Sequence, residues 1–217
     1  ISLKREDYLS ALRAIRGMCN ALQATSYDIT LAYSMLVYCL EALSHGYDSR
    51  DPRWEDYDPQ IRHKLDPLLD DVNDDQATQI RNVLLSSQSL RLRQQFISFI
   101  EDHLEDSFFK EEAADVQRPL RKSLLTEALS KAYDVRSRYV HALRPIRSQL
   151  RIPQLNQADH FMWDTEPYLT LSGLLRVTLH VIDTWIWNRS SVETEDIEWR
   201  EQLPGVVKFP LAPKYWI

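Results

Sequence analysis

The sequence is poor in the residues that make tight turns and covalent cross-links. Only four glycines and two cysteines occur among its 217 residues. The apolar residues recur mostly at intervals of three and four, which favours helices over strands joined by tight turns. Cys19 and Cys39 fall on apolar helical positions, at a spacing typical of neither a disulfide framework nor a zinc site. We therefore predict an all-α protein from a reducing, cytoplasmic compartment.

Long apolar runs and low-complexity linkers are also missing. No apolar stretch reaches the roughly 20 residues of a membrane span, and no signal-peptide pattern occurs, so we expect no membrane partner. An apolar fraction of 44% is enough for one sizeable core. We expect a single domain over residues 1–217, with an extended tail at 189–217. The first residue is Ile1, which is also compatible with a piece of a longer protein.

The charge is unevenly distributed along the chain. Nine Lys and Arg but only two acids lie between Arg118 and Arg151, which gives this segment +7, whereas the whole chain carries −6 and the remainder therefore −13. Such segregation predicts one cationic face that could bind a polyanion such as RNA. The alternative is a solvated helix face that is neutralised by acidic segments packed beside it, and charge alone does not separate the two.

Hydrophobic periodicity predicts a series of helices. Their approximate ranges are 2–24, 29–45, 59–72, 75–86, 89–108, a helix opened by Pro119, and 165–187. The first carries an apolar stripe that consists of Leu9, Leu12, Ile15, Cys19 and Leu22. The second begins after Asp28 as a cap, stops at Gly46 and is apolar on most sides, so we expect it to be the central buried helix.

Glu41 is the one acidic side chain within this apolar second helix. A buried carboxylate needs a hydrogen-bond donor or a counter-charge. Two interpretations follow: Glu41 orients an arginine or histidine of an active site, or it lies hydrated at the rim of the core.

The helix opened by Pro119 contains Tyr133-Asp-Val-Arg136-Ser137-Arg138-Tyr139-Val140-His141. An imidazole can move a proton at physiological pH, and a guanidinium can stabilise a phosphoryl transition state. At about 100° per residue, His141 projects roughly 140° away from Arg136 on a straight helix. The reach of the arginine, a helix that loosens before Pro145, or a second copy of the helix could bring the two groups together.

This nonapeptide resembles the HEPN superfamily, and specifically its ApeA-like branch with the signature Tyr-x-x-Arg-Ser-x-x-Val-His. The apolar helix around residues 39–43 and the helix around 91–100 add to the resemblance, which covers about residues 29–188. It implies a helical bundle that forms a two-fold homodimer with two Arg/His pairs in one cleft. In active members it also implies a metal-independent endoribonuclease that uses no cofactor.

The resemblance assigns a role to each residue of the motif. His141 would take the proton of a ribose 2'-hydroxyl or donate one to the leaving 5'-oxygen, and Arg136 would stabilise the pentacoordinate phosphorus. Ser137 would hold a phosphate oxygen, and the products would be a 2',3'-cyclic phosphate and a 5'-hydroxyl. Glu41 and Tyr133 are candidates for supporting roles. The candidate RNA-binding residues are Arg138, Arg144, Arg147 and Arg151.

Two positions depart from the family pattern. Ala142 stands where glycine is frequent, and Leu143 stands where members silenced by nucleotidyl transfer carry a tyrosine, so that form of regulation is not predicted. The resemblance suggests a stress, toxin or phage-defence setting, with a regulatory partner or a further domain left open. We find no metal-ligand motif: the pair His180 and Asp183 lacks the density of known sites, as does the set around His160.

The competing interpretation is a non-catalytic helical module. Many HEPN-like domains act as dimerisation or regulatory scaffolds. In that case Arg136 would be a buried ion-pair partner, for which Glu41 is a candidate, and His141 would be a capping or core residue.

Overall fold

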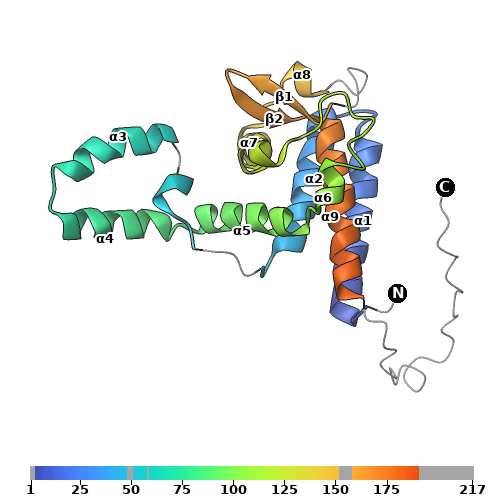
Figure 1. The fold of residues 1–217 in the computed structure, drawn as a ribbon, viewed down its shortest axis with the longest axis horizontal. Coiled ribbons are helices and arrows are strands. Elements are labelled where there is room, and N and C mark those ends of the chain that lie inside the picture. Colours follow the sequence, from blue (N-terminus) through green and yellow to red (C-terminus); the bar gives the residue numbers. More distant parts are fainter. Residues whose placement is uncertain (1–2, 48–50, 58, 152–157, 191–217) are drawn as a thin grey trace, which may run out of the picture.

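A computed structural model describes residues 3–47, 51–57, 59–151 and 158–190. Over these ranges the chain is mostly helical, with one small β-hairpin (Figure 1). The mostly helical character of the prediction is therefore confirmed, and the hairpin was not predicted. None of the helices in these ranges combines the length and the apolar character that a membrane crossing requires. Residues 191–217 of the predicted tail lie outside the described residues.

Most helix boundaries fall within three residues of the predicted ones. The elements are α1 Arg5–Ala24, α2 Ile29–Ser44, the 3-10 turn Trp54–Asp56, α3 Pro59–Asp70, α4 Asp74–Leu85, α5 Gln88–His103, α6 Asp106–Phe109, α7 Lys122–Ala142, α8 Ser148–Arg151, β1 His160–Trp163, β2 Glu166–Leu169 and α9 Leu171–Arg189. Asp28 caps α2, because its carboxylate accepts the N–H groups of Thr30 and Leu31 at 2.9 and 3.0 Å. Gly46 ends the helix with φ 81°, a left-handed value that glycine adopts without steric cost.

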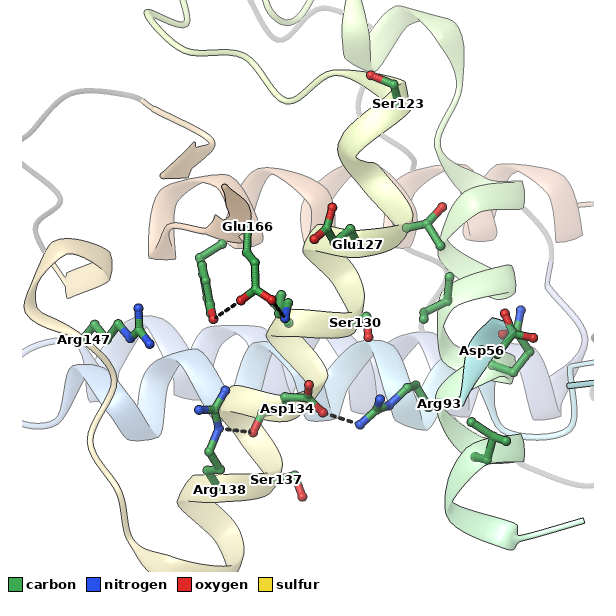
Figure 2. A pocket seen from close by; sticks show the side chains of 16 residues that line it. Asp56, Arg93, Ser123, Glu127, Ser130, Asp134, Ser137, Arg138, Arg147 and Glu166 are labelled. Atoms are coloured by element: carbon green, nitrogen blue, oxygen red, sulfur yellow. Dashed lines mark hydrogen bonds and ion pairs between the residues drawn. The ribbon is translucent and has the colours of Figure 1, made fainter. Parts of the chain in front are cut away.

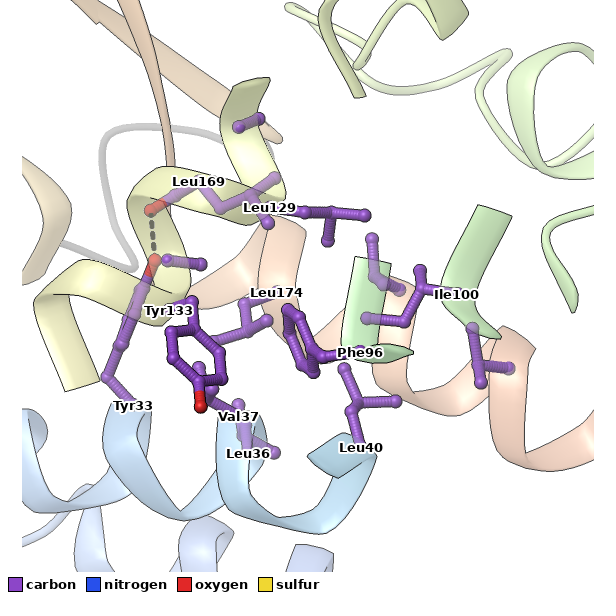
Figure 3. Packing of buried hydrophobic residues seen from close by; sticks show 14 of the residues in the cluster. Tyr33, Leu36, Val37, Leu40, Phe96, Ile100, Leu129, Tyr133, Leu169 and Leu174 are labelled. Atoms are coloured by element: carbon purple, nitrogen blue, oxygen red, sulfur yellow. Dashed lines mark hydrogen bonds between the residues drawn. The ribbon is translucent and has the colours of Figure 1, made fainter. Parts of the chain in front are cut away.

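Helix α2 is the centre of the core, as predicted. Its buried side chains face α5, α7 and α9, whose contributions include Phe96, Leu129 and Leu174 (Figure 3). Tyr33 is fully buried, and its hydroxyl donates a hydrogen bond of 3.2 Å to the carbonyl of Leu169. The bond satisfies a polar group that would otherwise be unpaired in the apolar interior.

A charged cluster that the sequence analysis missed joins the segments on either side of β1 and β2. Arg176 of α9 donates from Nε and Nη2 to the two carboxylate oxygens of Asp159, at 2.9 and 2.5 Å. The buried Asp159 also accepts the Leu120 N–H at 2.7 Å. A Cβ on Gly173 would lie 2.0 Å from the Asp159 carbonyl oxygen, so only glycine allows this close approach.

The same cluster explains an error in the predicted start of α7. Pro119 does not open the helix, which begins at Lys122. Leu120 is buried and its N–H is bound by Asp159, and the following residue, Arg121, is extended, so residues 119–121 are not helical. The single helix predicted over 89–108 is likewise interrupted, because α5 ends at His103 and α6 begins at Asp106.

The hairpin formed by β1 and β2 replaces the predicted start of the last helix at Thr165. The two strands pair antiparallel, with Trp163 opposite Glu166. The two residues between them, Asp164 and Thr165, both have positive φ, 47° and 71°. Turns of this kind usually carry Asn-Gly or Asp-Gly, and Asp-Thr gave no such signal.

Helices α3 and α4 form an arm that extends away from the helices α1, α2 and α9 (Figure 1). The segment before the arm contains two aromatic residues, Trp54 and Tyr57, which could pack either on the core or on the arm. Trp54 contacts both arm helices: its indole N–H donates to Asp66 at 2.8 Å, and the guanidinium of Arg81 lies 5.6 Å from its ring. This aromatic residue therefore contributes to the packing of the arm.

Helix α7 ends at a residue in a strained conformation. Leu143 has φ 49° and ψ 28°, and its N–H donates to the Tyr139 carbonyl at 2.8 Å. A left-handed residue at this position is usually glycine, because a Cβ is unfavourable there. Ala142, which stands where the family pattern has glycine, is still helical, and the left-handed position that ends the helix is occupied by Leu143.

We predict that Leu143→Gly stabilises the protein by about 0.5–1 kcal/mol, because it relieves the left-handed strain. The leucine side chain is 75% exposed, so its removal loses little burial. Urea denaturation measures the change. The matched control is Ala142→Gly, one residue earlier in helical geometry, which should destabilise by about 1 kcal/mol. Destabilisation by both substitutions would contradict the assignment of strain to Leu143.

Candidate functional site

Glu41 of α2 connects the motif helix α7 to the central helix. Its Oε2 accepts a hydrogen bond from Arg136 Nη2 at 2.5 Å, and its Oε1 accepts one from the Tyr133 hydroxyl at 3.1 Å. The side chains of Arg136 and Glu41 are only 18% and 16% exposed. Glu41, whose carboxylate was predicted to need a hydrogen-bond donor, therefore has two donors, and both belong to the motif.

Tyr133 completes this cluster as a neutral donor. Burial, followed by the negative charge of Glu41 and the hydrogen bond to it, raises the pKa of Tyr133 to about 12. Its ring packs on Phe96, with centroids 5.4 Å apart, and the guanidinium of Arg136 lies 5.8 Å from the ring centroid. The ring therefore helps to fix the direction of the arginine, because a guanidinium is attracted to an aromatic face.

The next two motif residues face a different surface. Ser137 and Arg138 line a groove of about 800 Å³ that runs along α7 between α5 and β2 (Figure 2). Two ion pairs cross it, Arg93 with Asp134 and Lys131 with Glu166. Four basic and four acidic side chains line this groove, so it has no net charge. The groove by itself is not the predicted cationic face.

His141 lies at the exposed end of α7, one helical turn after Ser137, so the two share a face of the helix. In the described part of the chain its imidazole has no hydrogen-bond partner. Arg136 is turned toward α2 and away from this face. His141 and Arg136 therefore lie on different sides of a straight helix, as the expected angle of roughly 140° between them predicts.

Val140 and Leu143 are apolar residues near the end of α7, but they do not belong to its buried face. They are 54% and 75% exposed, whereas Leu125, Leu129 and Ala132 of the same helix are buried. The last turn of α7 extends beyond the part that packs on α2 and α5. Apolar side chains therefore lie at the surface directly beside the motif.

The four candidate RNA-binding arginines divide into two groups. Arg138, Arg144 and Arg147 line one small hollow of about 110 Å³ next to Tyr168. Arg151 lies apart, half-buried, with its Nε donating to the Ile146 carbonyl at 2.9 Å. Its charge contributes, after the hydrogen bonds from Leu31, Tyr139 and Thr30, to the lowered pKa of Asp28.

Acidic residues neutralise only part of the basic segment 118–151. Each of the two expectations, a cationic face and a helix face neutralised by acids, therefore holds for part of the segment. Lys122, Lys131 and Arg136 have carboxylate partners on other elements, at 3.4, 2.5 and 2.5 Å. Among the described residues, Arg138, Arg144 and Arg147 have no such partner within 4.0 Å. Arg118 and Arg121 also have no such partner in the described part of the chain, but they precede α7, whereas Arg138, Arg144 and Arg147 lie together near its His141 end. Near His141, the predicted cationic face therefore consists of these three arginines.

The aromatic residues of the hairpin are a feature of this surface that the sequence analysis missed. The guanidinium of Arg147 lies 4.5 Å from the ring centroid of Trp163 and 5.1 Å from that of Tyr168. The aromatic residues Phe161, Trp163 and Tyr168, which are of a type enriched in strands, are the signal that could have indicated a strand here. This signal was overlooked because a helix was predicted over residues 165–187.

Comparison with protein families, with curated proteins and with solved structures finds no match. The HEPN resemblance therefore remains a prediction that depends on residues 133–141 and their helical context. What the geometry adds is the Glu41 carboxylate bound to Arg136, the exposed imidazole of His141 and the three arginines near it.

We predict that Glu41→Ala destabilises the protein by on the order of 3 kcal/mol, because it leaves a largely buried guanidinium without its counter-charge. Glu41→Gln, which keeps an acceptor for the Tyr133 hydroxyl, should cost less. Chemical denaturation measures both. Glu127→Ala, an exposed glutamate of α7, is the control and should change stability by no more than about 0.5 kcal/mol. Equal, small effects at both positions would show that the ion pair is not needed for stability.

Proposed function

We propose that the protein is a metal-independent endoribonuclease that acts as a homodimer. The observation that carries the proposal is the arrangement of the motif on α7, with Arg136 held by Glu41 and His141 exposed at the end of the helix. A base has to reach its substrate, and a phosphate-binding arginine has to be oriented. The arrangement is consistent with both requirements.

The proposed reaction is an intramolecular transesterification of the RNA backbone. The His141 imidazole removes the proton of a ribose 2'-hydroxyl, whose oxygen attacks the adjacent phosphorus. The bond from phosphorus to the 5'-oxygen breaks, and that oxygen is protonated by an imidazolium. Arg136 stabilises the charge on the phosphoryl oxygens, and Ser137 donates a hydrogen bond to one of them. The products are a 2',3'-cyclic phosphate and a 5'-hydroxyl.

The separation of Arg136 and His141 in one chain supports a site built from two chains. Exposed apolar side chains flank the ion pair: Tyr38 lies one turn before Glu41, and Val140 lies one turn after Arg136. An exposed apolar surface of this kind is typical of protein contacts. We propose that two copies meet here and that Arg136 of one chain acts with His141 of the other.

The same ion pair also favours the second candidate function, a non-catalytic scaffold. That interpretation predicted Arg136 as an ion-pair partner of Glu41, and the contact is present. His141 does not fit the scaffold role equally well, because it is neither buried nor hydrogen-bonded within the described residues. A stress or phage-defence setting and a regulatory partner belong to the proposal through the resemblance alone, and a cytoplasmic location belongs to it through the positions of the two cysteines.

Cleavage of RNA in excess chelator tests the catalytic assignment. The wild type should cleave, and His141→Ala and Arg136→Ala should each lower the rate by on the order of 100-fold or more, because each removes a group that acts in the transition state. Gel analysis of a labelled RNA measures the rate, and mass spectrometry of the products identifies the cyclic phosphate.

His63→Ala, an exposed histidine on the arm, is the matched control and should leave cleavage unchanged. Circular dichroism checks that each variant is folded. A folded wild type that leaves RNA intact, or undiminished cleavage by His141→Ala, would favour the scaffold.

A second prediction concerns the arginines beside the motif. Arg144→Ala with Arg147→Ala should weaken binding of single-stranded RNA and reduce the slope of log affinity against log salt by about 1.4, because two phosphate contacts are lost. Fluorescence anisotropy with the His141→Ala background measures binding without cleavage. Lys64→Ala with Arg91→Ala removes the same charge from two exposed sites elsewhere. If both pairs shift the slope equally, RNA does not bind at the proposed patch.

A further inference from the structure

The small hollow beside Tyr168 is lined by three arginines and by no acid. Arg138, Arg144 and Arg147 bring its charge, and the buried side chains of Ile146 and Leu150 also line it. Apolar, buried surroundings lower the local dielectric constant and strengthen the attraction of the arginines for an anion. The hollow therefore has the composition of an anion-binding site.

The acids of the adjoining groove do not neutralise this charge. The groove shares Arg138 and Arg147 with the hollow, and its acids Asp134 and Glu166 are already bound by other cations, one on α5 and one on α7 (Figure 2). The hydrogen bond from Lys131 is the main cause of the lowered pKa of Glu166, and the charge of Arg147 contributes least. The three arginines therefore keep most of their charge available for a ligand.

The local fold brings the three arginines together before any ligand binds. The left-handed Leu143 ends α7, and the chain turns back so that the Arg144 N–H donates to the Arg138 carbonyl at 3.4 Å. Ile146 then donates its N–H to the Thr30 hydroxyl at 3.3 Å, which attaches this segment to α2. A site that is arranged in advance loses less conformational entropy when it binds.

Two of the three side chains are also oriented by contacts of their own. Nε of Arg138 donates to the carbonyl of Asp134 at 3.2 Å, and the guanidinium of Arg147 lies against the rings of Trp163 and Tyr168. These contacts leave further N–H groups of each guanidinium for a ligand, because an arginine has five donors.

Size and charge together indicate a single phosphate group at the end of a molecule. The hollow has a volume of about 110 Å³, well below the roughly 300–1,000 Å³ of pockets that enclose larger ligands, so it suits a phosphate and not a whole nucleoside. A terminal phosphate carries a charge of about −1.5 to −2 and three free acceptor oxygens. A phosphodiester within a strand carries one negative charge and two such oxygens, so three arginines match the terminal group better.

The surface around the hollow favours RNA over a phosphopeptide as the carrier of this phosphate. The indole of Trp163, next to Arg147, is 37% exposed. Nucleobases stack on exposed aromatic rings of this kind. His141 follows Arg138 within one turn of α7, so a strand held by its end at the hollow starts beside the exposed imidazole.

We propose that Arg138, Arg144 and Arg147 bind the terminal phosphate of an RNA strand and that the base next to this phosphate stacks on Trp163. The preferred ligand is then an RNA that carries a phosphate at one end. This inference rests on the proposed function for the choice of RNA, but it does not require that the RNA is cleaved.

Competition against a fluorescent RNA measures the preference of the wild-type full chain. The competitors are three short RNAs of one sequence, with a 5'-phosphate, with a 3'-phosphate and with neither. All carry 2'-O-methyl groups, so that no 2'-hydroxyl can attack the backbone. At least one phosphorylated RNA should bind on the order of tenfold more tightly than the RNA without a terminal phosphate, because charge-assisted hydrogen bonds are gained. The preferred end gives the direction of the strand. Equal affinities of all three would overturn the proposal.

Matched variants assign the preference to the hollow. Arg144→Ala should remove it, whereas Arg91→Ala, which removes the same charge from an exposed site on α5, should keep it. A preference that survives Arg144→Ala would overturn the proposal. A phosphorylated RNA that lacks its terminal base should bind more weakly than its parent. A phosphoserine peptide that competes as well as the phosphorylated RNA would overturn the assignment of the ligand to RNA.

The cleavage assay separates this inference from the proposed function. Equal affinities, together with cleavage of RNA in chelator, would refute the terminal-phosphate site and leave the ribonuclease proposal standing. A preference that depends on Arg144, in a protein that leaves RNA intact, would refute the ribonuclease proposal and support the site.

Discussion

The carboxylate of Glu41 is the constraint on which the candidate site depends. It is the one acid in an apolar helix, and it accepts hydrogen bonds from two residues of the motif, Tyr133 and Arg136. Because the pair is largely buried, the carboxylate and the guanidinium each compensate for the desolvation of the other. The orientation of the arginine is therefore a consequence of the packing of α7 on α2.

This constraint divides the motif between two faces of α7. Arg136 is directed toward α2, whereas Ser137 and Arg138 line the groove and His141 lies one turn further along, in solvent. Arg138, Arg144 and Arg147, which have no carboxylate partner among the described residues, line one hollow near the same end of the helix. A single chain thus has an exposed imidazole and a cationic surface on one side and an oriented guanidinium on the other. The two-chain site that we propose would bring these groups together.

The sequence predicted the structure best in segments whose apolar residues follow a clear helical spacing. The cap at Asp28, the stop at Gly46 and the central position of α2 follow from local chemistry and apolar spacing, and the structure confirms them. The contact of Glu41 with Arg136 was expected only as one of several alternatives, because a helix does not reveal which distant helix it will face. The hairpin was missed since Asp164 and Thr165 form its turn without glycine. The exposure of Val140 and Leu143 depends on where α7 leaves the core, which is a tertiary property.

Activity in a mixture of two inactive variants tests the two-chain site most directly. Arg136→Ala and His141→Ala proteins would be unfolded together, refolded as mixed dimers and assayed for RNA cleavage in chelator. In a mixed dimer, the intact arginine of one chain and the intact histidine of the other form one complete site if the two residues act across the interface. The account predicts that the mixture regains cleavage that neither variant shows alone. A mixture as inactive as its components, with mixed dimers demonstrated by mass, would contradict it.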